Sequence, residues 1–334
     1  MKKFLNRAED FVDEMLDGIY LAHPQRLQPV ADDRRCLVSS TRVPGKVGIA
    51  TGGGSGLLPL FLGYVGRGML DGAAVGGVFQ SPSAHQMYEV TKAIDQGAGV
   101  LYVYGNYSGD ILNFDMATEM AEMDNIRVLS VVGNDDAASS PVGEEHKRRG
   151  VAGIFFVYKA AGAAAAEGAS LDEVKRIAEK ARDRSRTMGV ALSSCIVPEV
   201  GRPSFSIGDD EMEIGMGIHG EPGIRRGKLQ SADAVVDEMM KPLLSELALA
   251  PGDQVAVLMN GLGGTPQEEL YVMFRRVATL LAERAVTVSG TWVGEFATSM
   301  EMAGASISVL KLDEELKRLM QAPADTPFFA QHKR

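Results

Sequence analysis

One histidine of this chain lies in a setting suited to chemistry on a small ligand. The segment 215–223 reads GMGIHGEPG, so His219 lies between glycines and follows an acidic, strand-like run over residues 205–214. Glycines let the backbone approach a ligand and leave the space beside the imidazole open, where the ring can act as a nucleophile or base. A histidine kept for packing more often lies on an apolar face. The spacing alone leaves both a functional His219 and an incidental loop histidine open.

Asp110 is the second candidate, because it follows Gly109 where a helix is expected to begin. A carboxylate there is a good helix cap and interacts favourably with the helix dipole. It can also accept a proton from a substrate hydroxyl. Ser81 and the glycine-rich run at 52–56 follow neighbouring expected strands, so these groups are expected to converge. The convergence favours a catalytic Asp110 over an aspartate that only caps its helix.

The glycine-rich run reads GGGSG over residues 52–56 and follows an expected strand. The bare amides of Gly54, Ser55 and Gly56 can hold an anion or a polyol. The run lacks the Gly-Lys-Ser/Thr ending of a P-loop, and the next strand lacks the acidic residue of a dinucleotide site. Tight helix packing explains one or two glycines. Four glycines and a serine favour ligand contact.

Strands and helices alternate among the elements that would carry these residues. Short apolar runs predict strands at 47–50, 75–79, 100–104 and 126–132. Each run ends in a polar or glycine-rich turn, and a helical pattern follows the turn. Four such repeats are typical of an open, mostly parallel α/β sheet. Ligands of such sheets bind beyond the carboxyl ends of the strands, where the candidate loops lie.

The second half of the chain predicts another α/β unit, with a mixed sheet. Helices at 154–166 and 171–188 connect the two units, and we expect domains of 1–190 and 191–334. The remaining elements are strands at 254–259, 285–288 and 307–310 and helices at 232–247 and up to residue 283. The two candidate side chains, Asp110 and His219, therefore fall in different domains.

Composition excludes several classes of function. The chain has 334 residues, 45% of them apolar, and a net charge of −10, which argues against nucleic acid and anionic membranes as partners. Cys36 and Cys195 lie far apart without ligand spacing, so we expect neither a disulfide framework nor a structural metal site. The N-terminal residues lack the apolar core of a signal peptide, and no apolar run approaches a membrane span, so we expect a cytoplasmic protein.

Five motifs, found in order along the chain, carry a family resemblance. The chain resembles the substrate-binding subunit of bacterial dihydroxyacetone kinases over almost its whole length. The matching motifs are GGGSG at 52–56 with Pro59 and GYVG at 63–66, Phe79 with Ser81 and Pro82, GNYSGD at 105–110 with Asn113 and Phe114, GIHGEPG at 217–223, and NGLG at 260–263.

The resemblance implies a mechanism and partners. In the family, the histidine matching His219 adds to the ketone carbon to form a covalent hemiaminal, and the aspartate matching Asp110 is the base on the terminal hydroxyl. The resemblance also implies a homodimer that binds a short-chain ketose at the glycine run and at Ser81. The phosphoryl donor, ATP or ADP with magnesium, is carried by a separate helical nucleotide-binding subunit, so no cofactor or metal is expected in this chain.

Two positions depart from the family pattern. Leu57 replaces a histidine that assists the aspartate, and Gly105 replaces a lysine that binds a substrate hydroxyl. Losing both polar groups is expected to weaken dihydroxyacetone binding by roughly 1–3 kcal/mol for each group. Gly105 is also expected to open space for a longer ketose. His85, at the start of the helix after Ser81, either replaces the lost imidazole or is a helix-terminus residue without a ligand.

Two functions remain open on these residues. The first is a ketose kinase of the glycerone-kinase type, with a pocket rebuilt for a four- or five-carbon ketose. The second is a non-catalytic ketose-binding paralogue that acts as a sensor or coactivator of a regulator. Retention of His219 and Asp110 favours the kinase, whereas Leu57 favours the sensor.

Overall fold

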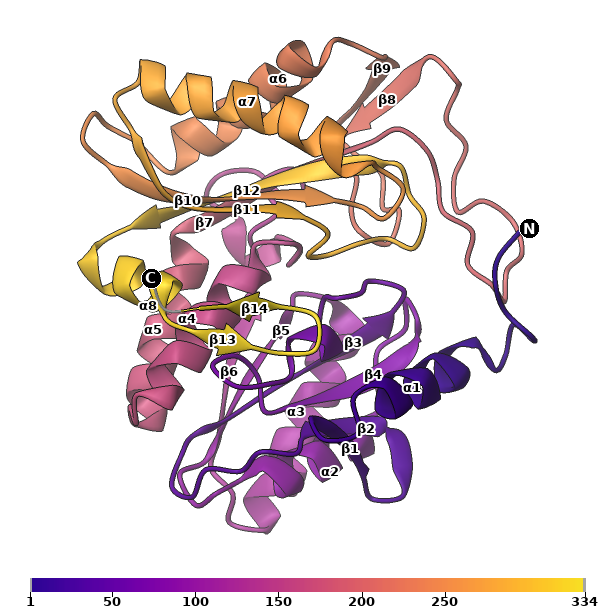
Figure 1. Ribbon diagram of the computed structural model, residues 1–334, viewed down its shortest axis with the longest axis vertical. Coiled ribbons are helices and arrows are strands. Elements are labelled where there is room, and N and C mark those ends of the chain that lie inside the picture. The colour runs from indigo at the N-terminus through magenta and orange to yellow at the C-terminus, as the bar shows by residue number, and fades with distance from the viewer. Residues whose placement is uncertain (1, 333–334) are drawn as a thin grey trace.

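The computed structural model describes residues 2–332, which form two six-stranded sheets, one above the other (Figure 1). The first sheet has the order β1-β2-β4-β3-β5-β6, and its four strands from β4 to β6 run parallel. Its strands are β1 (Leu27–Val30), β2 (Asp33–Ser39), β3 (Gly48–Ser55), β4 (Gly72–Val78), β5 (Val100–Gly105) and β6 (Val128–Gly133). The predicted open, mostly parallel sheet is confirmed.

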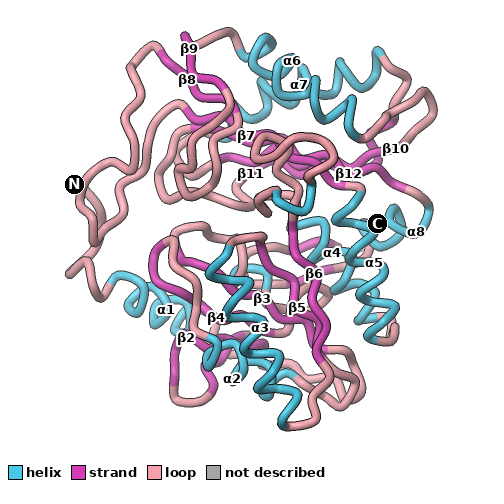
Figure 2. The backbone as a smooth tube through the Cα atoms, turned by 180° about the vertical axis from the view of Figure 1, so that it is seen from behind, coloured by secondary structure: helices cyan, strands magenta, loops and turns pink. Residues whose placement is uncertain are grey.

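Helices cover both faces of this first sheet, and α1 (Phe11–Ala22) packs against β2. On one face, α2 (Ala84–Ile94) and α3 (Ser108–Met123) lie side by side, nearest the viewer in Figure 2. On the other face, α4 (Ile154–Ala166) and α5 (Leu171–Asp183) cover β3, β5 and β6. The central strands are buried on both sides, as parallel strands in such sheets are. Their apolar side chains belong to two separate core clusters.

The second sheet has the order β11-β10-β12-β7-β8-β9 and is mixed, because only β10 and β11 run parallel. Its outer face carries two helices, at the top of Figure 1. The elements are β7 (Ser185–Ala191), β8 (Glu211–Ile214), β9 (Arg225–Lys228), α6 (Ala232–Glu246), β10 (Gln254–Gly261), α7 (Gln267–Glu283), β11 (Thr287–Gly294) and β12 (Gly304–Leu312). The expected mixed C-terminal sheet is confirmed.

The end of the chain returns to the first sheet's side of the molecule. After α8 (Glu314–Gln321), the short strands β13 (Ala324–Asp325) and β14 (Ala330–Gln331) form a hairpin. The hydroxyl of Thr326 donates to the carbonyl of Gly63 at 2.8 Å, far along the chain. We call the first sheet with its helices the first body, and the second sheet with its helices the second body. The C-terminal residues therefore pack against the first body and not only within the second.

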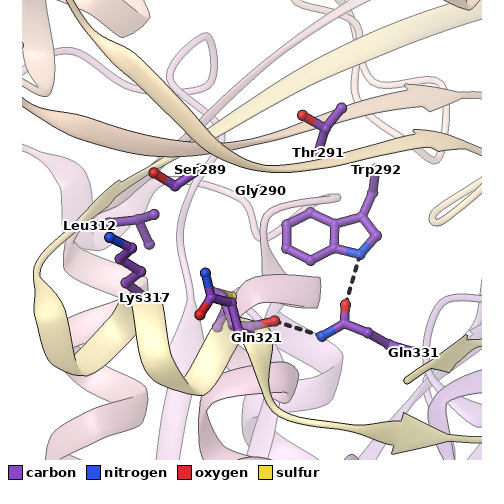
Figure 3. A pocket seen from close by; sticks show the side chains of 9 residues that line it. Ser289, Gly290, Thr291, Trp292, Leu312, Lys317, Gln321 and Gln331 are labelled. Carbon is purple, nitrogen blue, oxygen red and sulfur yellow. Dashed lines mark hydrogen bonds between the residues drawn. The ribbon is translucent and has the colours of Figure 1, made fainter. Parts of the chain in front are cut away.

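A small cavity lies where this C-terminal hairpin meets β11. Trp292 donates through Nε1 to Oε1 of Gln331 at 3.2 Å, and Gln331 donates to the carbonyl of Met320 at 2.8 Å (Figure 3). The cavity measures about 50 Å³, which is room for a few water molecules. None of the predicted site residues lines it, so it is not the predicted ligand site.

Three predicted elements differ from the structure. Residues 52–55, expected in a loop, lie in β3, and Gly52, Gly53 and Ser55 pair with β4. The helix expected over 171–188 ends at Asp183, and β7 follows it, so the expected boundary at residue 190 falls inside a strand of the second sheet. The strand-like run at 205–214 forms a strand only over β8, because the residues before it are mostly exposed.

Candidate functional site

His219 lies at the junction of the two bodies. The loop between β8 and β9 carries it, and its ring packs edge-on against two aromatic rings of the first body. The ring centroids are 5.2 Å from Phe79, which follows β4, and 4.7 Å from Tyr107, which precedes α3. The His219 side chain is 19% exposed, so the imidazole is held in place and still reachable from solvent. The rings of Phe79 and Tyr107 therefore flank the imidazole.

Phe79 is held in an unusual backbone conformation. Its φ is 58°, in the left-handed region that a bulky residue rarely adopts, and its amide donates to the carbonyl of Ser55 at 3.1 Å. Gly54 makes this turn possible, because a Cβ on it would lie 2.7 Å from the Phe79 Cα. Gly54 therefore supports the ring that contacts His219.

Tyr107 fills the space in front of Gly105. A Cβ on Gly105 would lie 2.9 Å from the Tyr107 ring, and the Tyr107 hydroxyl donates to the carbonyl of Gly150 at 3.1 Å. The expectation that Gly105 opens room for a longer ketose is therefore wrong, because an aromatic ring occupies that position. The space beside Gly105 is therefore filled by Tyr107.

Asp110 is a buried carboxylate with an unused oxygen. It is the third residue of α3, whose N-cap is Tyr107, and no side-chain capping bond forms there. Asp110 is 5% exposed, and its Oδ1 is buried without a hydrogen-bond partner among residues 2–332. Burial raises its pKa to about 6, against the opposing effects of Ser81 and the charge of His219. A buried, unsatisfied oxygen calls for a role, and capping does not supply one.

Glu221 orients the imidazole, although the sequence reasoning did not single it out. Nδ1 of His219 is 3.0 Å from Oε1 of Glu221, and the His219 amide donates to Oε2 at 3.0 Å. Burial would raise the pKa of Glu221, but the hydrogen bond and charge of His219, and the charge of Arg149, hold it at about 2. The carboxylate fixes the ring through Nδ1, so Nε2 is the ring nitrogen that Glu221 does not contact. The available signal was an acid two residues after the histidine.

The glycine run is explained largely by packing. A Cβ on Gly53 would lie 2.3 Å from the Phe61 ring, and the Ser55 hydroxyl donates to the carbonyl of Gly76 at 2.7 Å. Only Gly56 needs a left-handed conformation, with φ of 88°, and a Cβ there would lie 2.7 Å from the Met300 sulfur. The hydroxyl of Ser55 is thus committed to the sheet, so this residue could meet a ligand only through its backbone.

Leu57 lies in the core, and His85 lies at the surface. Leu57 is 1% exposed and belongs to the main core cluster, with its carbonyl accepting from the Thr298 amide at 3.1 Å. The side chain of His85 is 70% exposed, beside Glu89 and the ring of Tyr88. The structure therefore gives His85 the helix-terminus role, and Leu57 a packing role.

The described residues offer no site for a metal and no membrane span. Among residues 2–332, no cluster of three or more His, Cys, Asp or Glu could hold a metal ion. No helix in that range is long and apolar enough to cross a bilayer. The titratable side chains described at the junction include the imidazole of His219 and the buried carboxylate of Asp110.

The chain is similar to curated kinases and kinase subunits over almost its whole length. The chain is 48% identical to the dihydroxyacetone-binding subunit DhaK of PTS-dependent dihydroxyacetone kinase 2 from Listeria innocua, over 98% of this chain and 99% of that one. It is 42% identical to the L-erythrulose kinase of Pectobacterium atrosepticum, over 98% of this chain and 56% of that one.

Solved structures share the fold over the whole chain. The dihydroxyacetone kinase of C. freundii superposes with a TM-score of 0.91 at 31% identity, over 99% of this chain and 61% of that one. The dihydroxyacetone kinase operon co-activator Dha-DhaQ superposes with a TM-score of 0.89 at 32% identity, over 96% and 98%. The Dak1 domain model matches residues 17–328. The chain therefore belongs to the Dak1 domain family, the family of the dihydroxyacetone-binding subunits, as the motifs around Asp110 and His219 indicated.

Proposed function

We propose that this protein is the ketose-binding subunit of a ketose kinase and that His219 holds the ketose as a covalent hemiaminal. The observation that supports this most directly is the pairing of Nδ1 of His219 with ionised Glu221, at 3.0 Å, which leaves Nε2 as a nucleophile. Nε2 forms a bond to the carbonyl carbon while the carbonyl π pair moves to the oxygen. The Nδ1 proton leaves through Glu221, and the oxygen takes up a proton, so the adduct is neutral.

Asp110 acts as the base on the terminal hydroxyl. Its pKa of about 6 leaves it mostly ionised at neutral pH yet basic enough to take a proton as the phosphoryl group is transferred. Its buried Oδ1 has no partner among the described residues and is free for a substrate hydroxyl. The hemiaminal fixes the ketone end, so the hydroxyl end is held for in-line transfer, where positioning supplies most of the catalysis.

The phosphoryl donor is supplied by a separate helical nucleotide-binding subunit with magnesium. The ketose-binding protein itself forms a homodimer. The chain has no P-loop, which supports the division of labour. The Listeria innocua relative bears the name of a binding subunit of a larger kinase, which also supports it. The substrate is a short-chain ketose with an unhindered carbonyl. Dihydroxyacetone and erythrulose are the first compounds to test, since relatives are named for kinases of both.

The alternative is a ketose sensor that activates a regulator, and the likeness to the co-activator Dha-DhaQ supports it. Asp110 argues for the kinase. Burying an unpaired carboxylate destabilises the fold, and a protein that only binds ketose would gain nothing from a base. Leu57, which packs in the core, gives no further support to the sensor.

The test of the proposed function has two stages. The isolated protein is titrated with dihydroxyacetone and erythrulose, and intact mass spectrometry and crystallography are used to look for a bond at Nε2 of His219. We expect an adduct with the wild type and none with His219→Ala. Then turnover is measured with candidate donor subunits and nucleotides. Ketose affinity that is unchanged in His219→Ala contradicts the hemiaminal, and an adduct without turnover for any donor supports the sensor.

A further inference from the structure

The segment that joins β6 to α4, residues 134–153, leaves the first sheet but is fastened to the second body. The Thr187 amide, in β7, donates to the carbonyl of Asp135 at 2.7 Å. Arg148 is fully buried and makes a two-pronged ion pair with Glu246, at the end of α6, at 2.6 and 3.0 Å. The segment therefore bridges the two bodies, because Tyr107 and Asn106 of the first body also donate to its carbonyls.

Arg149 extends from this segment to the His219 loop. Its Nε donates to Oδ2 of Asp136 at 2.9 Å, and its Nη2 donates to the carbonyl of Gly215 at 3.2 Å. Its Nη1 lies 3.8 Å from Oε2 of Glu221. The Arg149 side chain is only 15% exposed, so solvent screens these charges weakly. The arginine thus touches both ends of the loop that presents the imidazole.

The loop is shaped to admit this contact. A Cβ on Gly217 would lie 2.1 Å from Oε2 of Glu221 and 2.6 Å from Nη1 of Arg149. Any side chain at this position would separate the two charges or push Glu221 away from the histidine. The result is a continuous chain of alternating charge from Asp136 through Arg149 to Glu221, which ends at the imidazole.

We propose that Arg149 is a positioning residue for the nucleophile: it acts through Glu221, keeping that carboxylate ionised, oriented and only partly available to attract a second proton onto His219. This inference rests on the proposed hemiaminal function and extends it to a residue that does not touch the ketose. The groups that face Glu221 are His219 and Arg149, with Asp135, Asp136 and Tyr107 around them. Asp110, whose pKa is about 6, also interacts with the charge of His219, and it is unchanged in every variant used to test this proposal.

The expected effect of removing the arginine has a definite sign. Without the charge of Arg149, the negative charge of Glu221 is less compensated and favours the doubly protonated imidazole. A doubly protonated ring has no lone pair on Nε2, so the adduct forms only at higher pH. Removing the charge of Glu221 has the opposite effect, because the cationic ring then loses its partner.

The experiment measures dihydroxyacetone affinity of the full-length protein by calorimetry from pH 5.5 to 8.5, a range chosen to span about one unit either side of the ordinary histidine value. We expect Arg149→Met to weaken binding about tenfold at pH 7, as loss of such supporting contacts often does, and to move the acid limb to higher pH. Arg149→Lys retains the charge and should bind within about threefold of the wild type. Arg67→Met, at an arginine that is 78% exposed, is the matched control and should bind as the wild type does.

A double-mutant cycle tests whether the arginine acts through Glu221. Glu221→Gln should move the acid limb to lower pH, and Arg149→Met should add no further pH shift in that background. Equal losses at every pH, or a full Arg149→Met effect in the Glu221→Gln background, would show a merely structural role and overturn the proposal. Wild-type affinity and pH profile in Arg149→Met would overturn it as well.

The His219→Ala variant separates this inference from the function on which it rests. If His219→Ala binds ketose as the wild type does, the hemiaminal itself fails. If His219→Ala loses binding while Arg149→Met does not, only the role of Arg149 fails. Should Arg149→Met not fold, as judged by circular dichroism, the Arg149→Lys profile and the Glu221→Gln shift decide: an unshifted acid limb in Glu221→Gln overturns the proposal.

Discussion

Asp110 and His219 come from different bodies of the molecule, and the charge of the histidine lowers the pKa of an aspartate that burial raises to about 6. The acid stands in the first turn of α3, and the imidazole stands on the loop between β8 and β9. The two groups therefore act on one substrate only while the bodies hold their relative position. Ionisation of Asp110 at this junction should therefore affect both turnover and the stability of the fold.

Asp110→Asn separates catalysis from binding. Asparagine is nearly isosteric but does not accept the proton, so we expect turnover with the donor subunit to fall by about 100-fold or more. Ketose affinity of the isolated protein should change little, because the bond to His219 remains. Steady-state kinetics and calorimetry measure the two quantities. Wild-type turnover in Asp110→Asn would show that another group is the base.

The pH dependence of turnover should follow Asp110. Only the ionised carboxylate accepts a proton, and its pKa in the free protein is about 6, so kcat/KM should rise with pH through about 6. A second profile, measured at saturating ketose, reports the same carboxylate in the bound state. An acid limb that stays at the same pH in a slow but active Asp110→Asn would assign that limb to a different group.

The free energy of unfolding should also depend on the ionisation of Asp110, but it should fall as pH rises. The folded-state pKa of Asp110, about 6, lies above its ordinary value of 3.8, so the folded protein binds more protons between these pH values. Stability attributable to this carboxyl is therefore present at low pH and is lost as pH rises through about 4 to 6, by about 3 kcal/mol.

Asp110→Asn should consequently be more stable than the wild type at pH 7 and similar at pH 4. Chemical denaturation at the two pH values measures the difference in the free energy of unfolding. Asp115→Asn, at an exposed position on the same helix, is the control and should show no such pH-dependent gain. A destabilised Asp110→Asn at pH 7 would mean that the carboxylate has a stabilising partner after all.

Gly105→Ala tests whether Tyr107 fixes the pocket wall. The new methyl group would meet the Tyr107 ring at 2.9 Å, and the ring is tied to Gly150 by its hydroxyl. We expect a loss of about 1–2 kcal/mol in the free energy of unfolding and weaker ketose binding, as overpacking produces. Gly18→Ala, in α1 with nothing within 4 Å of the added carbon, should instead stabilise by up to about 1 kcal/mol. Unchanged binding in Gly105→Ala would show that the ring yields freely.

Glycerol should compete poorly with dihydroxyacetone. A polyol has the hydroxyl groups but no carbonyl carbon for Nε2 of His219, so it forgoes the covalent bond. We expect the wild type to prefer the ketone by more than about tenfold and His219→Ala to lose that preference. Competition calorimetry with both compounds provides the comparison. Tight glycerol binding by the wild type would point to recognition by hydroxyl groups alone.

The sequence by itself determined the family and the four parallel strands of the first sheet, with the helices that follow β4 and β5. The helix expected after the first of these strands is wrong, because only a short 3-10 turn over residues 62–64 lies between β3 and β4. Strand and helix periodicity is local, so it survives in the sequence, and the helix at 154–166 is found as predicted at α4. Motifs such as GIHGEPG can be recognised in the letters alone, because their glycines mark places of close backbone approach. His219 and Asp110 were found in this way.

The tertiary structure alone decided what surrounds those groups. The glycines at 52–54 continue β3 because β4, Phe61 and Phe79 crowd them, and that crowding comes from residues distant in sequence. Gly105 gives no extra space because Tyr107 turns back over it. Arg149 reaches Glu221 only because the segment after β6 crosses to the second body. Burial, charge pairing and the space beside a glycine depend on neighbours far along the chain, and these appear only when the chain is folded.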